Sequence, residues 1–255
     1  MKRLGTGWLL ALQFFSVIPV KKELPMEKTN VTSMYLMLPL LGGFLGSITA
    51  AAIWGLLEFT ELSPLFLAFT VVIFGILLTG GLHMDGVADV GDAYFSYQDR
   101  KKRLEIMEDP RIGAFGAMAL ILIIVGKIIV VAEVIDEISL MAIVLVPVFS
   151  RIGLLLFFTT TGSAKEMGLS AFFHQQTDGK WIAMGAFIYL AVIFGLFGYW
   201  QSWGAAFGLV ALLLVLLYVY RKWCLKNFGG VTGDLLGAYV EGTEFLLWTA
   251  FLFFI

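Results

Sequence analysis

Long runs of apolar residues, separated by short polar segments, make up most of this chain. A helix that crosses a bilayer needs about 20 consecutive, predominantly apolar residues. By that measure the pattern predicts about seven transmembrane helices, at residues 33–57, 64–82, 112–132, 138–160, 181–199, 204–220 and 235–255. The first 20 residues begin with Lys2 and Arg3 and continue with a shorter apolar stretch that no small-residue cleavage site follows. We therefore predict an N-terminal helix that lies in the membrane interface.

The composition supports this reading of the pattern. Hydrophobic residues make up 60% of the 255 residues, charged residues make up 14%, and the mean hydropathy is +0.91. Soluble domains carry roughly 25% charged residues. No polar linker divides the chain, so residues 1–255 are predicted to form a single integral membrane domain of the all-α class. The net charge of −2 gives no reason to expect a nucleic-acid partner, and nothing in the sequence specifies an oligomeric state.

The basic residues are distributed unequally between the two predicted sides of the membrane. With residues 21–32 in the cytoplasm, the spans leave three external turns, at 58–63, 133–137 and 200–203. These turns contain no Lys or Arg, and 15 of the 17 basic residues fall on cytoplasmic segments. This distribution follows the positive-inside rule. Three polar loops then face the cytoplasm and are predicted to share one site: 83–111, 161–180 and 221–234.

The first of these loops begins with an acidic segment, "GGLHMDGVADVGDAYF" at residues 80–95. Read as a helix, it places Asp85, Asp89 and Asp92 on one face, at i, i+4 and i+7. Carboxylates are the ligands that Mg²⁺ prefers, and protein-bound Mg²⁺ commonly contacts a substrate phosphate. The acids could instead form an ordinary solvated surface. His83 is a candidate substrate ligand or a structural histidine.

A second polar motif, "QDRKKRLEIMEDPRIGAFG", precedes the third predicted span. Its basic cluster, residues 100–103, is expected to contact anionic lipid headgroups. Arg111 lies where the next helix begins, which is a favourable position for binding phosphate. Glu108 and Asp109 could orient Arg111, hold a second ion, or pair with the basic cluster.

The third motif, "GGVTGDLLGAYVEGTEF" at residues 229–245, repeats glycines followed by acids. Thr232 and Asp234 precede the last span, and Glu241 falls inside it. An acidic residue within a membrane span indicates a functional role. The two cations inside spans, Lys127 and Arg151, either pair with such acids or bind pyrophosphate.

These three motifs occur in an order that resembles the cobalamin synthase (adenosylcobinamide-GDP ribazoletransferase) family. The likeness covers nearly the whole chain and includes "QFFSVIPV" near the N-terminus and the pair Ser150–Arg151. Two departures are minor: Ala93 replaces a common glycine, and Pro110 replaces a frequent serine. The resemblance implies that adenosylcobinamide-GDP reacts with α-ribazole, or its 5′-phosphate, to give adenosylcobalamin, or its 5′-phosphate, and GMP. It implies Mg²⁺ as the cofactor and a multi-pass enzyme of a prokaryotic cell membrane.

Within this resemblance the residues receive predicted roles. The predicted metal ligands are Asp85, Asp89, Asp92 and Asp234. The predicted catalytic residues are Asp92, Arg111 and Glu108, with Asp92 as a third ligand or a general base. The predicted substrate-binding residues are His83, Asp109, Lys127, Arg151, Thr232 and Glu241.

Two other classes of protein fit part of the pattern. An ion-coupled transporter would also have buried charges, although such proteins tend to bind their substrates near the bilayer midplane, between internal repeats. A CDP-alcohol-type lipid phosphotransferase would also use acidic residues and a metal ion to bind phosphate. The arginine of its D-G-x-x-A-R signature is missing here after "DGVAD".

Overall fold

The structure is a computed structural model that describes residues 2–200 and 202–253. Within these ranges the chain forms eleven α-helices and no β-sheet. The helices are α1 (Lys2–Phe15), α2 (Lys28–Phe59), α3 (Pro64–Leu78), α4 (Leu82–Phe95), α5 (Arg100–Ile106), α6 (Ala114–Val134), α7 (Leu140–Thr160), α8 (Leu169–Gln175), α9 (Gly179–Trp200), α10 (Trp203–Asn227) and α11 (Gly233–Phe251). The predicted all-α class is confirmed.

Five of these helices are long and apolar enough to cross a membrane: α2, α6, α7, α9 and α10. α7 lies at the centre of the bundle, where it packs against α2, α9, α10 and α11. α6 and α10 instead leave most of their apolar surface uncovered; Leu122 on α6, for example, is 74% exposed. Apolar faces of this extent are expected to contact lipid. The helices therefore suit a multi-pass membrane protein.

For the two remaining predicted spans, 64–82 and 235–255, the structure differs from the prediction. Residues 64–82 do not form one straight helix, because α3 ends at Leu78 and the chain turns by 92° into α4. Gly80 and Gly81 make this turn with φ of +65° and +74°. Residues other than glycine rarely adopt this backbone region. α3 and α4 count as a sixth span only if the bent pair is taken together. The last predicted span, α11, carries three carboxylates in 19 residues and is not among the five apolar helices.

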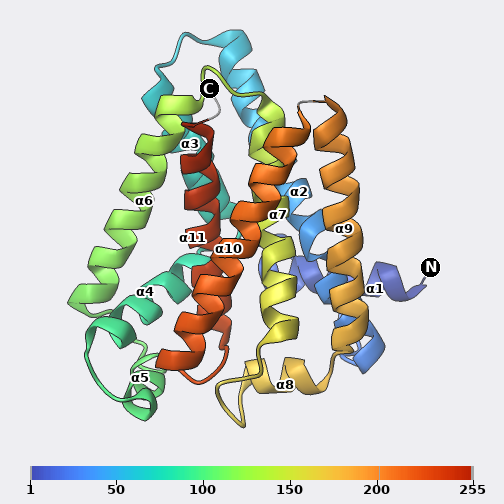
Figure 1. Cartoon of the computed structure of the whole chain (residues 1–255), viewed down its shortest axis with the longest axis vertical. Helices are drawn as coiled ribbons and strands as arrows, with labels where there is room; N and C mark the ends of the chain where they lie inside the picture. The colour runs from blue at the N-terminus through green and yellow to red at the C-terminus, as the bar shows by residue number, and fades with distance from the viewer. Residues whose placement is uncertain (1, 201, 254–255) are drawn as a thin grey trace.

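The N-terminal helix α1 runs across the long axis of the bundle (Figure 1). It buries one face, which includes Leu10 and Ala11, and packs along α2. Its position in the membrane interface stays a prediction.

The polar segments gather at opposite ends of the bundle. α5 and α8 lie at one end, with the loops that flank them, while the turns after α2 and α6 lie at the other (Figure 1). The three predicted loops therefore do meet at one end of the molecule. α4 lies next to that end, between α6 and α11.

Candidate active site

An acidic cavity lies beside α4 and has a volume of about 880 Å³. Asp85 and Asp89 of α4 and Asp234 of α11 line it together, so the structure brings three of the four predicted metal ligands to one place. Gly86 makes this possible, because a methyl group at this residue would lie 2.5 Å from the carbonyl oxygen of Asp234. The absence of a side chain at residue 86 lets the start of α11 lie directly against α4.

Asp234 is oriented by the start of its own helix. Thr232 is the N-cap of α11: its hydroxyl oxygen accepts a hydrogen bond from the Leu235 N–H at 3.2 Å. The same hydroxyl donates to Asp234 Oδ2 at 3.3 Å. Thr232 is buried and does not line the cavity, so the structure shows it positioning Asp234; its predicted contact with substrate stays a prediction.

The acids of the cavity repel one another. Partial burial, followed by the negative charges of Asp234, Asp85 and Asp92, raises the pKa of Asp89 to about 7. A bound cation would relieve this repulsion. The donors are all carboxylate oxygens, which suit Mg²⁺.

The acids fit an ion that takes only part of its ligands from protein. No group of three or more potential ligands stands ready to enclose a metal ion within the described part of the chain. Mg²⁺ usually binds one or two carboxylates and completes its shell with water and substrate phosphates. One or two carboxylates from among Asp85, Asp89 and Asp234 therefore suit Mg²⁺, if water and a substrate phosphate supply its remaining ligands.

Asp92 does not line this cavity. Its Oδ2 accepts a hydrogen bond from the Gly113 N–H at 2.6 Å, and its Oδ1 accepts one from the Gly116 N–H at 2.8 Å. These two amides belong to the start of α6, which lacks a side-chain cap of its own. The structure thus gives Asp92 a capping contact between α4 and α6, and separates it from the other predicted ligands.

Part of the second polar motif also lines the cavity. Glu108 and Asp109 line it, and their predicted roles in catalysis and substrate binding stay predictions. Arg111 is 86% exposed, and its guanidinium contacts Asp109 at 2.6 and 2.8 Å. The Arg111 guanidinium lowers the pKa of Asp109 to about 2. Arg111 is therefore already paired with an acid, and its predicted role in binding phosphate stays a prediction.

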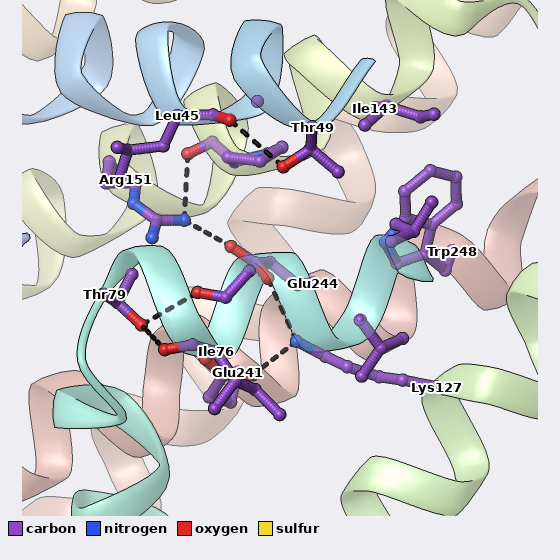
Figure 2. A pocket seen from close by; sticks show the side chains of 15 residues that line it. Leu45, Thr49, Ile76, Thr79, Lys127, Ile143, Arg151, Glu241, Glu244 and Trp248 are labelled. Atoms are coloured by element: carbon purple, nitrogen blue, oxygen red, sulfur yellow. Dashed lines mark hydrogen bonds and ion pairs between the residues drawn. The ribbon is translucent and has the colours of Figure 1, made fainter. Parts of the chain in front are cut away.

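A separate charged cluster lies inside the helix bundle and lines a cavity of only about 60 Å³. Figure 2 shows Arg151 and Lys127 reaching Glu244 from opposite sides. Lys127 contacts Glu244 at 3.0 Å and also pairs with Glu241, and Ser150 donates to Glu244 at 3.1 Å.

Two acids and two cations balance in this cluster. The structure therefore does not bring Lys127, Arg151 and Glu241 to the acidic cavity, and their predicted binding of substrate stays a prediction. Of the alternatives left open by the sequence, the structure shows the ion pairs. Glu244 forms ion pairs with both Lys127 and Arg151, and it was not among the predicted site residues.

His83 is buried next to Gly237 of α11. Its Nδ1 atom has no hydrogen-bond partner among the described residues. The side chain does not line the acidic cavity. Its predicted contact with substrate stays a prediction.

Lys165 is a neighbour of the cavity lining that the sequence did not single out. It is one of many basic residues at this end of the molecule, and it lies far in sequence from the acidic motifs. In the structure its ammonium contacts Glu108, which lines the cavity, at 2.7 Å. A local pattern contains no signal for such a contact between two loops.

Comparison with known proteins identifies the family. Residues 7–252 match the model of a family described as cobalamin-5-phosphate synthase. A protein of Geobacillus thermodenitrificans named adenosylcobinamide-GDP ribazoletransferase is 38% identical over 252 residues, which cover 97% of this chain and 95% of the relative. Proteins with the same name from Geobacillus kaustophilus and Clostridium botulinum are 36% and 32% identical, over 97% and 94% of this chain and 95% of each relative. No solved structure matches. The resemblance read from the three motifs is confirmed, and the chain belongs to the cobalamin-5-phosphate synthase family.

Proposed function

We propose that this protein is an adenosylcobinamide-GDP ribazoletransferase that acts in the membrane. It joins adenosylcobinamide-GDP to α-ribazole, or its 5′-phosphate, and releases GMP, which completes the cobalamin. The observation that carries the proposal is the convergence of Asp85, Asp89 and Asp234 on one cavity in a chain of this family.

The products define the bonds that change. An oxygen of the α-riboside forms a bond to the phosphorus that carries cobinamide, and the bridging P–O bond of the diphosphate breaks. GMP leaves with the electrons of that bond. The attacking hydroxyl loses its proton during this step, so a base within hydrogen-bond reach is required.

Asp85, Asp89 and Asp234 would hold Mg²⁺. When bound, Mg²⁺ neutralises charge that develops on the transferring phosphorus and on the leaving phosphate. Thr232 orients Asp234 through its hydroxyl, and the turn at Gly80 and Gly81 presents α4 to the cavity.

The remaining walls of the cavity suit a large, amphiphilic substrate. Apolar side chains from three helices and from the loop before α6 line it beside the acids, among them Phe14, Met84, Ile112 and Leu120. We propose that these side chains contact the corrinoid while the acids face its diphosphate.

The acidic cavity faces the cytoplasm in this proposal. The end of the molecule that holds α5 and α8 carries the loops rich in Lys and Arg, and the opposite turns carry acids. The positive-inside rule then places α5 and α8 in the cytoplasm of a prokaryotic cell.

Turnover by the purified protein in liposomes tests the proposal. The reaction contains adenosylcobinamide-GDP, α-ribazole and Mg²⁺, and chromatography separates the products. We expect a complete cobamide and GMP in equal amounts, and we expect both to disappear on chelation of the metal. Folded protein that forms neither product with α-ribazole or with its 5′-phosphate would contradict the proposal.

A further inference from the structure

The acidic cavity lacks a cation of its own for an anionic substrate. Every ionisable side chain that lines it, as far as the chain is described, is acidic: Asp85, Asp89, Glu108, Asp109 and Asp234. Lys127 and Arg151 are paired inside the bundle, and Arg111 is paired with Asp109. A metal ion alone would have to offset these acids and the diphosphate together.

Lys165 lies outside the lining of the cavity, but it contacts a residue that belongs to that lining. Its ammonium contacts Glu108 Oε1 at 2.7 Å, and Glu108 lines the cavity. The lysine side chain is 26% exposed, so it is largely covered by protein, whereas that of Glu108 is 67% exposed.

The backbone fixes the position of Lys165 relative to Asp234. Residues 163 and 231 form a β-bridge, in which the Ala164 N–H donates to the Val231 carbonyl and the Val231 N–H donates to the Gly162 carbonyl, both at 2.9 Å. Gly230 permits this approach, because a methyl group there would lie 2.5 Å from the Gly162 oxygen. The bridge therefore holds the loop of Lys165 beside the start of α11, which carries Asp234.

The partner of Lys165 is easily replaced. An ion pair with an exposed carboxylate is weak, because water screens it. A diphosphate brings more negative charge and several acceptor oxygens, and hydrogen bonds between ammonium and phosphate are among the stronger ones. Such a ligand can replace Glu108 as the partner of the Lys165 ammonium, and the β-bridge between residues 163 and 231 need not move.

We propose that Lys165 binds the diphosphate oxygens of the nucleotide substrate, and that Glu108 holds this lysine in place until the substrate enters. The inference rests on the proposed function and adds a residue to its substrate site. It also gives Glu108 the role of a counter-ion in place of the predicted catalytic role.

The test compares four variants by equilibrium binding of adenosylcobinamide-GDP to protein in nanodiscs, and by KM and kcat. Lys165→Met should weaken binding and raise KM by roughly 10-fold to 100-fold. Lys165→Arg should restore most of the binding, because it keeps the positive charge. Lys180→Met removes another exposed lysine from the same end of the molecule and should change neither value.

Glu108→Gln distinguishes binding of substrate by Lys165 from a purely structural role of the ion pair between Lys165 and Glu108. It breaks the same contact as Lys165→Met but leaves the lysine free, so substrate binding should be unchanged or tighter. Equal weakening in Glu108→Gln and Lys165→Met would show that the pair only stabilises the loop, and would overturn the inference.

Turnover by the wild-type protein is measured first. If the wild type forms no cobamide, the proposed function fails and the inference fails with it. If the wild type is active and Lys165→Met binds substrate as the wild type does, the inference alone is overturned.

Discussion

The carboxylate of Asp92 accepts a hydrogen bond from the backbone N–H of Gly113 at 2.6 Å, across 21 residues of sequence. Its second oxygen accepts from the N–H of Gly116, so one side chain of α4 satisfies two amides at the start of α6. The negative charge also lies at the positive end of the α6 dipole. The contact ties the helix that carries the acids to a helix whose apolar surface is mostly exposed.

Asp92→Ala should therefore lower the free energy of unfolding by about 1–2 kcal/mol, even without metal, because the amides lose their cap. Thermal unfolding in detergent, followed by tryptophan fluorescence with and without Mg²⁺, measures the effect. Unchanged stability without Mg²⁺, together with loss of the stabilisation that Mg²⁺ provides, would instead support the predicted role of Asp92 as a metal ligand.

Asp85→Asn should abolish turnover and leave the protein folded. Removing one of several mutually repelling carboxylates should keep or slightly raise the stability of the metal-free protein. Product formation and thermal unfolding are measured on the same preparation. Glu58→Gln, near the end of α2 far from the cavity, is the matched control and should retain full activity. Normal turnover by Asp85→Asn would remove this residue from the site.

Gly86→Ala should reduce turnover by roughly 100-fold, because the added methyl group pushes α4 away from Asp234 and misplaces the acids. Gly55→Ala is the control, since a methyl group at residue 55 meets no atom within 4 Å. Steady-state kinetics compare the two variants. Equal activity of both would show that α4 and α11 do not need to lie this close for catalysis.

Lys127→Met should destabilise the protein by about 3–5 kcal/mol, because it leaves buried carboxylates without their partner. Adding Glu241→Gln should recover part of the loss, since Glu244 still pairs with Arg151. Unfolding of the single and double variants in detergent measures the coupling. Additive losses would mean that Lys127 and Glu241 do not depend on each other for stability.

The sequence by itself determined the class of this protein and its family. Hydrophobic runs are a local property, and a helix must satisfy its backbone hydrogen bonds within each run that lies in lipid. The positions of α2, α6, α7, α9 and α10 therefore follow from residue pattern alone. The acidic motifs are equally local, and they were sufficient to indicate the family.

The tertiary structure alone decided which charges meet. The 92° turn after α3 places α4 between α6 and α11, so Asp89 faces Asp234 while Asp92 turns to the amides of α6. Spacing at i, i+4 and i+7 predicts a shared helix face but not the neighbour that each residue along it meets. Pairing between Lys127 and Glu244, 117 residues apart, depends on how whole helices pack. Coulomb attraction depends on the distance between two charges in space, and their separation along the chain does not specify that distance.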